Sequence, residues 1–254
     1  MSIALVGGTG IDEMAGLSGH AMTRVATLFG EAEVTQSELG GRPVTFIPRH
    51  GAAHSCPPSA INYRAQMAAL KTLGVTRIIA VCAVGSLHES LSVGAFAVLG
   101  DFIDLTRRRD TTFFDSPDGP VVHTDFSEPY CPEVSEAIVK ACGDAGINYA
   151  ASAVYVGVDG PRYESPAEVK LYSSWGGQVI GMTGLPEAVL AREAGICYGS
   201  LAVVTNVAVG CPTPVSHDDV RATMRDAGDR LRDVIARAVE LIPDKRRCRC
   251  GVES

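Results

Sequence analysis

The stretch Ile3-Ala4-Leu5-Val6-Gly7-Gly8-Thr9-Gly10 decides the fold class of this chain. Its first four residues form a short apolar run, which predicts a buried β-strand, and the glycines predict a tight turn directly after it. Such a turn lets backbone N–H groups approach an oxyanion closely, and Thr9 adds a hydroxyl donor. The stretch lacks the third glycine of a dinucleotide-binding turn and the lysine of a P-loop, so a purely structural turn explains it equally well by itself.

Further short apolar runs alternate with helical patterns along the chain. We expect strands at residues 4–6, 44–47, 77–81, 95–99, 153–157, 178–182 and 198–204, and helices at residues 59–73, 131–145, 187–193 and 216–241. The strands are largely apolar on both faces, as in a sheet that helices cover on each side. The sequence therefore predicts one α/β domain over residues 1–254, with a central mixed, twisted sheet flanked by helices and a polar tail from about residue 244 to residue 254.

Composition narrows the partners and the compartment. The 254 residues carry a formal net charge of −7, and no basic block precedes Lys245-Arg246-Arg247. The electrostatic footprint of a nucleic-acid-binding protein is therefore missing from the sequence, and an anionic substrate would need a local positive site. The sequence begins without a basic leader and contains no apolar stretch of about 18 residues, which predicts a cytoplasmic protein without a membrane partner.

The eight cysteines predict neither a zinc site nor a disulfide framework. Six of them lack CxxC pairing, namely Cys56, Cys82, Cys131, Cys142, Cys197 and Cys211. We therefore expect no metal, and mostly reduced thiols in the core or in a pocket. Cys248 and Cys250 form a CxC motif on the polar tail, which can close a small disulfide ring, take part in redox exchange or lie idle on a frayed end.

Three more predicted strand ends carry groups suited to an anion. Pro48-Arg49-His50-Gly51 places a guanidinium and an imidazole at a carboxyl end, where ligands of α/β sheets tend to bind. Cys82-Ala83-Val84-Gly85-Ser86 and Gly181-Met182-Thr183-Gly184 offer small residues that leave backbone groups accessible. Each end has a structural explanation when taken alone. Together with the first turn, they fit inorganic phosphate better than a nucleotide.

These motifs resemble the trimeric purine nucleoside phosphorylase and methylthioadenosine phosphorylase family over nearly the whole chain. In order, they are GGTG at Gly7, RHG at Arg49, NYRA at Asn62, AVGS at Ala83, GPRYE at Gly160, GMTGLPE at Gly181 and VVTN at Val203. The resemblance implies a nucleoside phosphorylase fold and a homotrimer, or a hexamer of two trimers. It also implies that inorganic phosphate is a co-substrate and that no metal or organic cofactor is needed.

The resemblance also assigns roles to residues. It implies a phosphate site made by Thr9, Arg49, His50, Ala83 through its backbone, and Thr183, with Arg49 and His50 counted among the catalytic residues. Met182 would lie beneath the ribose, and Tyr163 would stack on the base where the family usually has Phe. His123 would reach into the pocket of a neighbouring subunit. Cys82 departs from the Thr or Asn often found at its position.

Glu164, Asn206 and Ala208 bear on the choice of base. A 6-oxopurine presents N1–H as a donor and guanine adds a 2-amino donor, so the acceptor-only carboxylate of Glu164 matches that edge. The Asn206 amide can donate to O6 and interact with N7, including after N7 gains a proton as the base departs, so we expect Asn206 to be catalytic. Adenine-specific members of the family have Ser at the Glu164 position and carboxylates at the Asn206 and Ala208 positions. Taken alone, Glu164 could instead pair with Arg162 on the surface, and Asn206 could end a strand.

His217 bears on the 5′ end of the sugar. It begins the predicted C-terminal helix in a Ser-His-Asp-Asp-Val arrangement, which resembles the members that bind a 5′-hydroxyl, whereas methylthio-specific members have an apolar residue there. A histidine that faces water at a helix end is the alternative.

The sequence therefore predicts a purine nucleoside phosphorylase of purine salvage. It would cleave 6-oxopurine nucleosides, such as inosine and guanosine, with phosphate to the free base and ribose 1-phosphate. An S-methyl-5′-thioinosine or methylthioadenosine phosphorylase is one alternative, and a purine nucleoside-binding module without catalysis is another.

Overall fold

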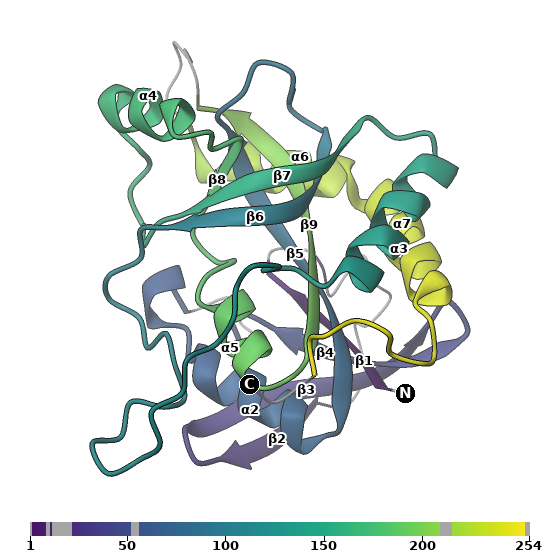
Figure 1. Ribbon diagram of the computed structural model, residues 1–254. Helices are drawn as coiled ribbons and strands as arrows, with labels where there is room; N and C mark the ends of the chain where they lie inside the picture. The colour runs from purple at the N-terminus through teal and green to yellow at the C-terminus, as the bar shows by residue number, and fades with distance from the viewer. Residues whose placement is uncertain (1, 9–10, 12–21, 52–55, 209–214, 252–254) are drawn as a thin grey trace.

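The chain folds around a nine-stranded mixed sheet with helices on both faces (Figure 1). The computed structural model describes residues 2–8, 11, 22–51, 56–208 and 215–251. The strand order is β2-β3-β4-β1-β5-β8-β7-β6-β9, and β9 also pairs with β5, so the second half of the sheet closes on itself. The predicted α/β class with a central mixed sheet is confirmed.

All seven predicted strands are present, most of them longer than predicted. The strands are β1 (Ser2–Gly7), β2 (Met22–Thr27), β3 (Gly30–Leu39), β4 (Arg42–Pro48), β5 (Val75–Ser86), β6 (Phe96–Asp104), β7 (Tyr149–Gly157), β8 (Val179–Gly181) and β9 (Cys197–Val207). The helices are the 3-10 turn η1 (Pro58–Ala60) and α2 (Tyr63–Thr72), α3 (Pro132–Asp144), α4 (Pro166–Ser174), α5 (Glu187–Glu193), α6 (His217–Asp226) and α7 (Gly228–Leu241). The hairpin strands β2 and β3 and the helix α4 were not predicted from the sequence.

Successive residues of the central strands pack into two separate cores. In β1, Ala4 and Val6 belong to a core that includes residues of α2 and α5, whereas Ile3 and Leu5 belong to a core with residues of α3, α6 and α7. Side chains alternate between the two faces of a strand, so a strand that is apolar on both faces needs helices on both sides. This arrangement leaves the strand ends as the place where polar groups gather.

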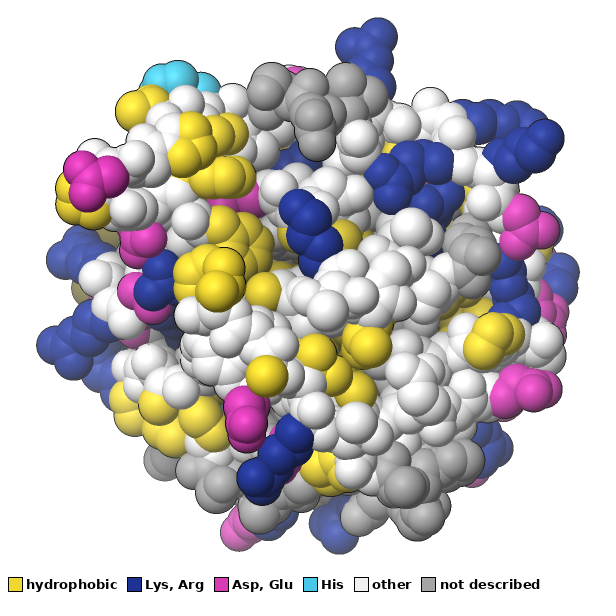
Figure 2. Space-filling view, turned by 90° about the horizontal axis from the view of Figure 1, so that it is seen from below, with side chains coloured by type: hydrophobic (Ala, Val, Ile, Leu, Met, Phe, Trp, Pro, Cys, Tyr) yellow, Lys and Arg dark blue, Asp and Glu magenta, His cyan; other side chains and the backbone are white. Residues whose placement is uncertain are grey.

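The surface carries charges of both signs. On the face shown in Figure 2, basic side chains are spread around the molecule and interspersed with acidic ones, and hydrophobic side chains form small separate groups. In the part of the chain that the structure describes, the helices are too short or too polar to span a bilayer.

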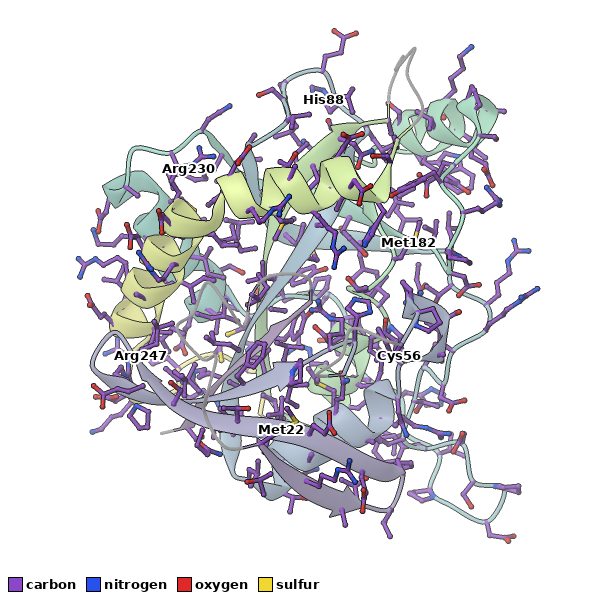
Figure 3. The ribbon with its side chains drawn as sticks, turned by 180° about the vertical axis from the view of Figure 1, so that it is seen from behind. Met22, Cys56, His88, Met182, Arg230 and Arg247 are labelled. Atoms are coloured by element: carbon purple, nitrogen blue, oxygen red, sulfur yellow. The ribbon has the colours of Figure 1, made fainter. Side chains whose placement is uncertain are left out.

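The predicted single helix at residues 216–241 is wrong. The chain forms two helices, α6 and α7, which meet at Ala227 and Gly228, and Figure 3 shows the change of direction between them. Glycine is a poor helix former, so a bend is less costly there than elsewhere. The bend lets α7 pack against α3 while α6 lies against β9.

The segment after α7 is not a frayed tail. It runs back from α7 towards the middle of the molecule (Figure 1), and Arg246 Nη1 donates to the Gly195 carbonyl at 3.1 Å. The carboxylate of Glu133 accepts from the backbone N–H groups of Arg247 at 2.6 Å and Cys248 at 3.1 Å. Residues 245–251 are therefore docked, which excludes the frayed end among the alternatives for this range.

Four of the cysteines lie together in space, which their spacing in the sequence did not predict. The sulfur atoms of Cys131, Cys197, Cys248 and Cys250 all lie within 4.8 Å of one another. The spacing of the cysteines along the chain does not indicate this cluster, because its members come from the start of α3, the start of β9 and the docked segment after α7.

Candidate active site

A cavity of about 520 Å³ lies at the carboxyl ends of β1, β4, β5 and β9. These strands are parallel neighbours, so their ends meet at one edge of the sheet, where ligands of α/β proteins bind. The pairing of β1 with β5 runs to Ala80, and β8 joins β5 only at Gly85. The cavity borders the part of β5 between these two pairings. Ten predicted residues line it: Arg49, His50, Cys82, Ala83, Tyr163, Glu164, Met182, Thr183, Asn206 and His217.

Arg49 lies where β1 and β5 diverge, and its guanidinium is held by the protein. The Arg49 side chain is only 1% exposed, and its Nε and Nη2 donate to the two carboxylate oxygens of Glu187 at 2.7 and 2.9 Å. Nη1 also donates to the Val81 carbonyl at 2.9 Å. Burial disfavours the charge, but the attraction and hydrogen bonds of Glu187 outweigh it and raise the pKa of Arg49 above its ordinary value. The guanidinium is thus a fixed donor whose charge is already compensated.

His50 packs closely against the turn after β1. Its Nδ1 lies 2.8 Å from the Cys56 carbonyl, which can only accept, so Nδ1 carries the proton. In the neutral ring, Nε2 is then the acceptor nitrogen. A Cβ on Gly8 would lie 2.9 Å from His50 Cδ2 and 3.8 Å from Arg49 Nη1. The absence of a Cβ at Gly8 therefore lets the backbone lie close to the His50 ring.

Cys82 and Ala83 form the wall of the cavity along β5. The Cys82 side chain is buried, and its sulfur lies 4.0 Å from Ser200 Oγ. Burial raises the pKa of the Cys82 thiol to about 11, against the opposing effect of Arg49. Cys82 is therefore a neutral thiol at physiological pH, which makes it a weak nucleophile. Its place in the wall is that of a small packing residue.

Two side chains that were not predicted from the sequence hold the backbone of the loop after β8. Tyr155 Oη accepts from the backbone N–H groups of Thr183 at 3.2 Å and Gly184 at 3.1 Å. Arg109 Nη2 donates to the Met182 carbonyl at 2.6 Å. These bonds hold the backbone of the loop while the Thr183 and Met182 side chains border the cavity. Tyr155 and Arg109 carry no local sequence signal, because their partners are backbone groups far along the chain.

Met182 also depends on a glycine in the neighbouring loop. Figure 3 shows Met182 and Cys56 on the same side of the molecule, and both line the cavity. Gly160 has a φ of +66°, and a Cβ there would lie 2.3 Å from Met182 Sδ. Only glycine satisfies both the left-handed backbone and the close contact.

Asn206 lies within β9, and not beyond its end as one alternative supposed. Its Oδ1 lies 3.2 Å from Thr205 Oγ1, a hydroxyl that is equally close to the Val84 carbonyl. A Cβ on Gly85 would lie 2.9 Å from Asn206 Nδ2. Thr205 and Gly85 therefore fix where the Asn206 amide lies against the cavity. The register of β5 against β9 shifts between Val84 and Gly85 at the same place.

Glu164 faces the cavity and is not paired with Arg162, the surface alternative. Arg162 instead forms two 2.7 Å hydrogen bonds with Glu168. Glu164 is half-buried, and burial raises the pKa of its carboxyl group. Ser165, the next residue, caps α4 through a reciprocal pair of bonds with Glu168, which fixes the loop that carries Glu164. Tyr163 lies at the rim of the cavity and is 40% exposed.

The first turns of α6 cover the remaining side of the cavity. Ser216 caps the helix by accepting from the Asp219 N–H at 3.1 Å. His217, Val220, Arg221 and Met224 recur at helical spacing and all line the cavity. Of these four residues, only His217 was predicted from the sequence to line the site. The same spacing could have indicated Arg221, which adds a positive charge at this wall.

Two predicted residues lie elsewhere, and a third is not described. His123 is exposed in the long segment between β6 and α3 and is not among the described lining residues of its own chain. Ala208 packs against a small core that includes Ile180, and its N–H donates to the Ser86 carbonyl at 2.9 Å. Ala208 was predicted to bind the base, but it is not among the described residues that line the cavity. Thr9 lies outside the described residues.

The fold and the cavity define an α/β protein with a deep ligand site at the ends of its parallel strands. The chain belongs to the phosphorylase superfamily, whose family model matches residues 2–240. It is 43% identical over 253 residues to a probable 6-oxopurine nucleoside phosphorylase of Moorella thermoacetica, covering 99% of this chain and 97% of that relative.

Two further comparisons support the membership. The chain is 42% identical over 251 residues to a probable S-methyl-5′-thioinosine phosphorylase of Methanopyrus kandleri, covering 98% of this chain and 96% of the relative. It also resembles the crystal structure of a methylthioadenosine phosphorylase from an antarctic soil metagenomic library, with a TM-score of 0.90 and 37% identity over 99% of this chain and 90% of that one.

Proposed function

We propose that the protein cleaves 6-oxopurine nucleosides, such as inosine and guanosine, with inorganic phosphate to give the free base and ribose 1-phosphate. The observation that carries the proposal is that Glu164 and Asn206 line the same cavity as Arg49 and His50. The first pair matches the edge of a 6-oxopurine, and the second pair suits an oxyanion. One cavity thus offers recognition of the base beside a place for phosphate.

Phosphate would bind among directional donors, and not against a free cation. Glu187 already compensates the charge of Arg49, so attraction by net charge at that point is small. The candidate contacts are Arg49 Nη1, the backbone near Gly8 and Ala83, and the Thr183 hydroxyl. His50 Nε2 can donate to phosphate when the ring is protonated, or accept from a protonated phosphate when it is neutral. Fixed donors of this kind position a nucleophile without reorganisation.

In the reaction, a phosphate oxygen forms a bond to C1′ of the ribose as the C1′–N9 bond breaks. The electron pair of the broken bond moves into the purine, which gains a proton at N7 or another ring nitrogen. The Asn206 amide would stabilise the negative charge that accumulates on the leaving base. The Glu164 carboxylate would accept from N1–H, and from the 2-amino group of guanine. A base with an unprotonated N1, such as adenine, would face this carboxylate as acceptor against acceptor.

The 5′ substituent is the point on which a second function has support. His217 would hydrogen-bond a 5′-hydroxyl, as in inosine. Val220 and Met224 on the same face of α6 offer an apolar wall, which suits a methylthio group. S-methyl-5′-thioinosine is therefore the second candidate substrate, and it would use Glu164 and Asn206 in the same way.

The active unit would be a trimer, alone or paired into a hexamer. The basis is the family resemblance, which implies that His123 reaches into the pocket of a neighbouring subunit. The exposed position of His123, outside the described lining of the cavity of its own chain, is compatible with that role. The chemistry needs phosphate as co-substrate, and we expect no metal or organic cofactor in the reaction itself.

A substrate panel tests the proposal. Inosine, guanosine, S-methyl-5′-thioinosine, adenosine and methylthioadenosine are incubated with the protein in the presence and absence of phosphate, and the free base is measured. We expect phosphate-dependent release of hypoxanthine and guanine and little release of adenine. Fastest turnover of adenosine or methylthioadenosine would contradict the base assignment. Binding of inosine without phosphate-dependent release would indicate a non-catalytic module.

The matched variant for the 5′ group is His217→Val. If His217 binds a 5′-hydroxyl, this variant raises KM for inosine and leaves or lowers KM for S-methyl-5′-thioinosine. Equal changes for both nucleosides would remove His217 from the discrimination.

A further inference from the structure

Four cysteines that lie far apart in the sequence form one buried cluster away from the cavity. Cys131 precedes α3, Cys197 begins β9, and Cys248 and Cys250 belong to the segment that docks after α7. Cys131, Cys197 and Cys250 are at most 5% exposed, and Cys248 is half-buried. None of the four is among the described lining residues of the active-site cavity.

The distances within the cluster suit a tetrahedral metal site. Cys248 Sγ lies 3.3 Å from Cys197 Sγ and 3.6 Å from Cys131 Sγ, and all four sulfurs lie within 4.8 Å of one another. Zinc binds thiolates at about 2.3 Å, so the sulfurs of a tetrahedral site are about 3.8 Å apart. The four sulfurs thus surround one point as a ligand set does, instead of forming two separate pairs.

The start of helix α3 favours negative charge at one member of the cluster. Cys131 is the N-cap residue of the 13-residue helix α3, whose N-terminal dipole attracts negative charge.

The backbone around the cluster is already fixed. The Glu133 carboxylate accepts from the backbone N–H groups of Arg247 and Cys248, and these bonds hold the CxC segment against α3. The same carboxylate lies 3.4 Å from Arg77 Nη2. The backbone N–H of Cys131 donates to the Tyr198 carbonyl at 2.8 Å, which joins the start of α3 to β9. Such supporting bonds orient ligands around a metal in closed structural sites.

We propose that Cys131, Cys197, Cys248 and Cys250 form a structural binding site for a thiophilic divalent cation, with Zn²⁺ as the expected occupant. Binding to the neutral thiols forms four metal–sulfur bonds and releases four protons to solvent, without oxidation or reduction. A closed set of four thiolates suits a structural role, because a catalytic zinc site keeps one position open. The metal would hold the docked segment against α3 and β9 and would take no part in phosphorolysis.

The test uses the full chain and two metal probes. Zinc per chain is measured in the protein as purified, and the reduced, metal-free protein is then titrated with Co²⁺, which absorbs strongly when four thiolates bind it tetrahedrally. We expect one metal ion per chain, the cobalt–thiolate spectrum, and its loss when Zn²⁺ is added. Cys250→Ser should weaken Co²⁺ binding at least about 10-fold.

Cys142→Ser is the matched control, because Cys142 is equally buried in α3 but outside the cluster. It should bind Co²⁺ as the unmodified chain does. If Cys250→Ser fails to fold, Cys248→Ser at the half-exposed position provides the same comparison. Folded, reduced protein that binds neither metal would overturn the proposal. So would purified, metal-free protein in which only four of the eight thiols react after unfolding, since that result identifies two disulfides instead.

Discussion

Glu187 is expected to be the most sensitive position of the site scaffold, although it does not line the cavity. Both of its carboxylate oxygens accept from Arg49, and Oε1 also accepts from Tyr198 Oη at 2.8 Å. In Glu187→Gln, one of these oxygens becomes an NH₂ group that meets an N–H donor of Arg49. The substitution therefore leaves the guanidinium charge buried without its counter-charge.

The expected cost follows from the burial of the pair, whose side chains are 1% and 0% exposed. Removing one partner of a buried ion pair destabilises a protein by about 3–5 kcal/mol. For a chain of this size, about 2–4 °C of melting temperature is lost per kcal/mol, so Glu187→Gln should lower Tm by roughly 6–20 °C. Below the transition, the displaced guanidinium should raise KM for phosphate more than KM for the nucleoside.

Thermal and urea unfolding measure the loss, and a second substitution tests its cause. Arg49→Met combined with Glu187→Gln removes the buried charge, so the double variant should be more stable than Glu187→Gln alone. Asp244→Asn is the control, because Arg42 pairs with a carboxylate that is 85% exposed, and such pairs contribute about 0–1 kcal/mol. If the double variant is as unstable as the sum of its single variants, the buried charge is not the cause and the reasoning fails.

Three further predictions concern the base side of the cavity. Asn206→Ala should lower kcat/KM for inosine by about 10²–10³ with an unchanged melting temperature, and an unchanged rate would remove Asn206 from the mechanism. Gly85→Ala places a Cβ 2.9 Å from Asn206 Nδ2, so this variant should lower kcat. When it is combined with Asn206→Ala, kcat should fall no further than in Asn206→Ala alone, and additive losses of kcat would contradict this coupling. Glu164→Gln should lower turnover of inosine and guanosine yet raise stability at neutral pH, because burial raises the pKa of this carboxyl group and its charged form is the unfavourable one. In the unsubstituted chain, the Glu164 carboxyl binds its proton more tightly in the folded state than in the unfolded state. The stability advantage of Glu164→Gln should therefore vanish as pH falls through the raised pKa and the carboxyl becomes neutral. An advantage that persists in acid would refute this explanation.

The sequence predicted the strands that carry the site but not the edge of the sheet. Strands such as β5 and β9 are apolar on both faces, so their residues have one favourable environment and the pattern is clear. β2 and β3 carry exposed, charged residues, for example Arg24 and Glu31, and their pairing depends on tertiary contacts more than on local pattern. The same limit applies to the bend at Gly228, which depends on α6 and α7 packing against different partners.

The residues that border the cavity were predictable because they lie at the carboxyl ends of strands or directly after them. The topology then brings those strand ends together, as it does for Arg49, Ala83 and Asn206. The groups that position these residues could not be predicted in this way. Tyr155 and Arg109 act on backbone atoms of the loop after β8, and the position of a backbone partner leaves no trace in the residue types.

Arg49 is the case in which the motif predicted the residue but not its state. An arginine after a strand, next to a histidine, indicates a positive site for an anion. Its counter-charge, Glu187, lies 138 residues later on the buried face of α5, where a helical pattern gives no sign of a pairing. With the charge compensated, Arg49 contributes geometry more than potential. Selectivity for phosphate must then come from fixed N–H and O–H donors, which recognise the shape of the anion as well as its charge.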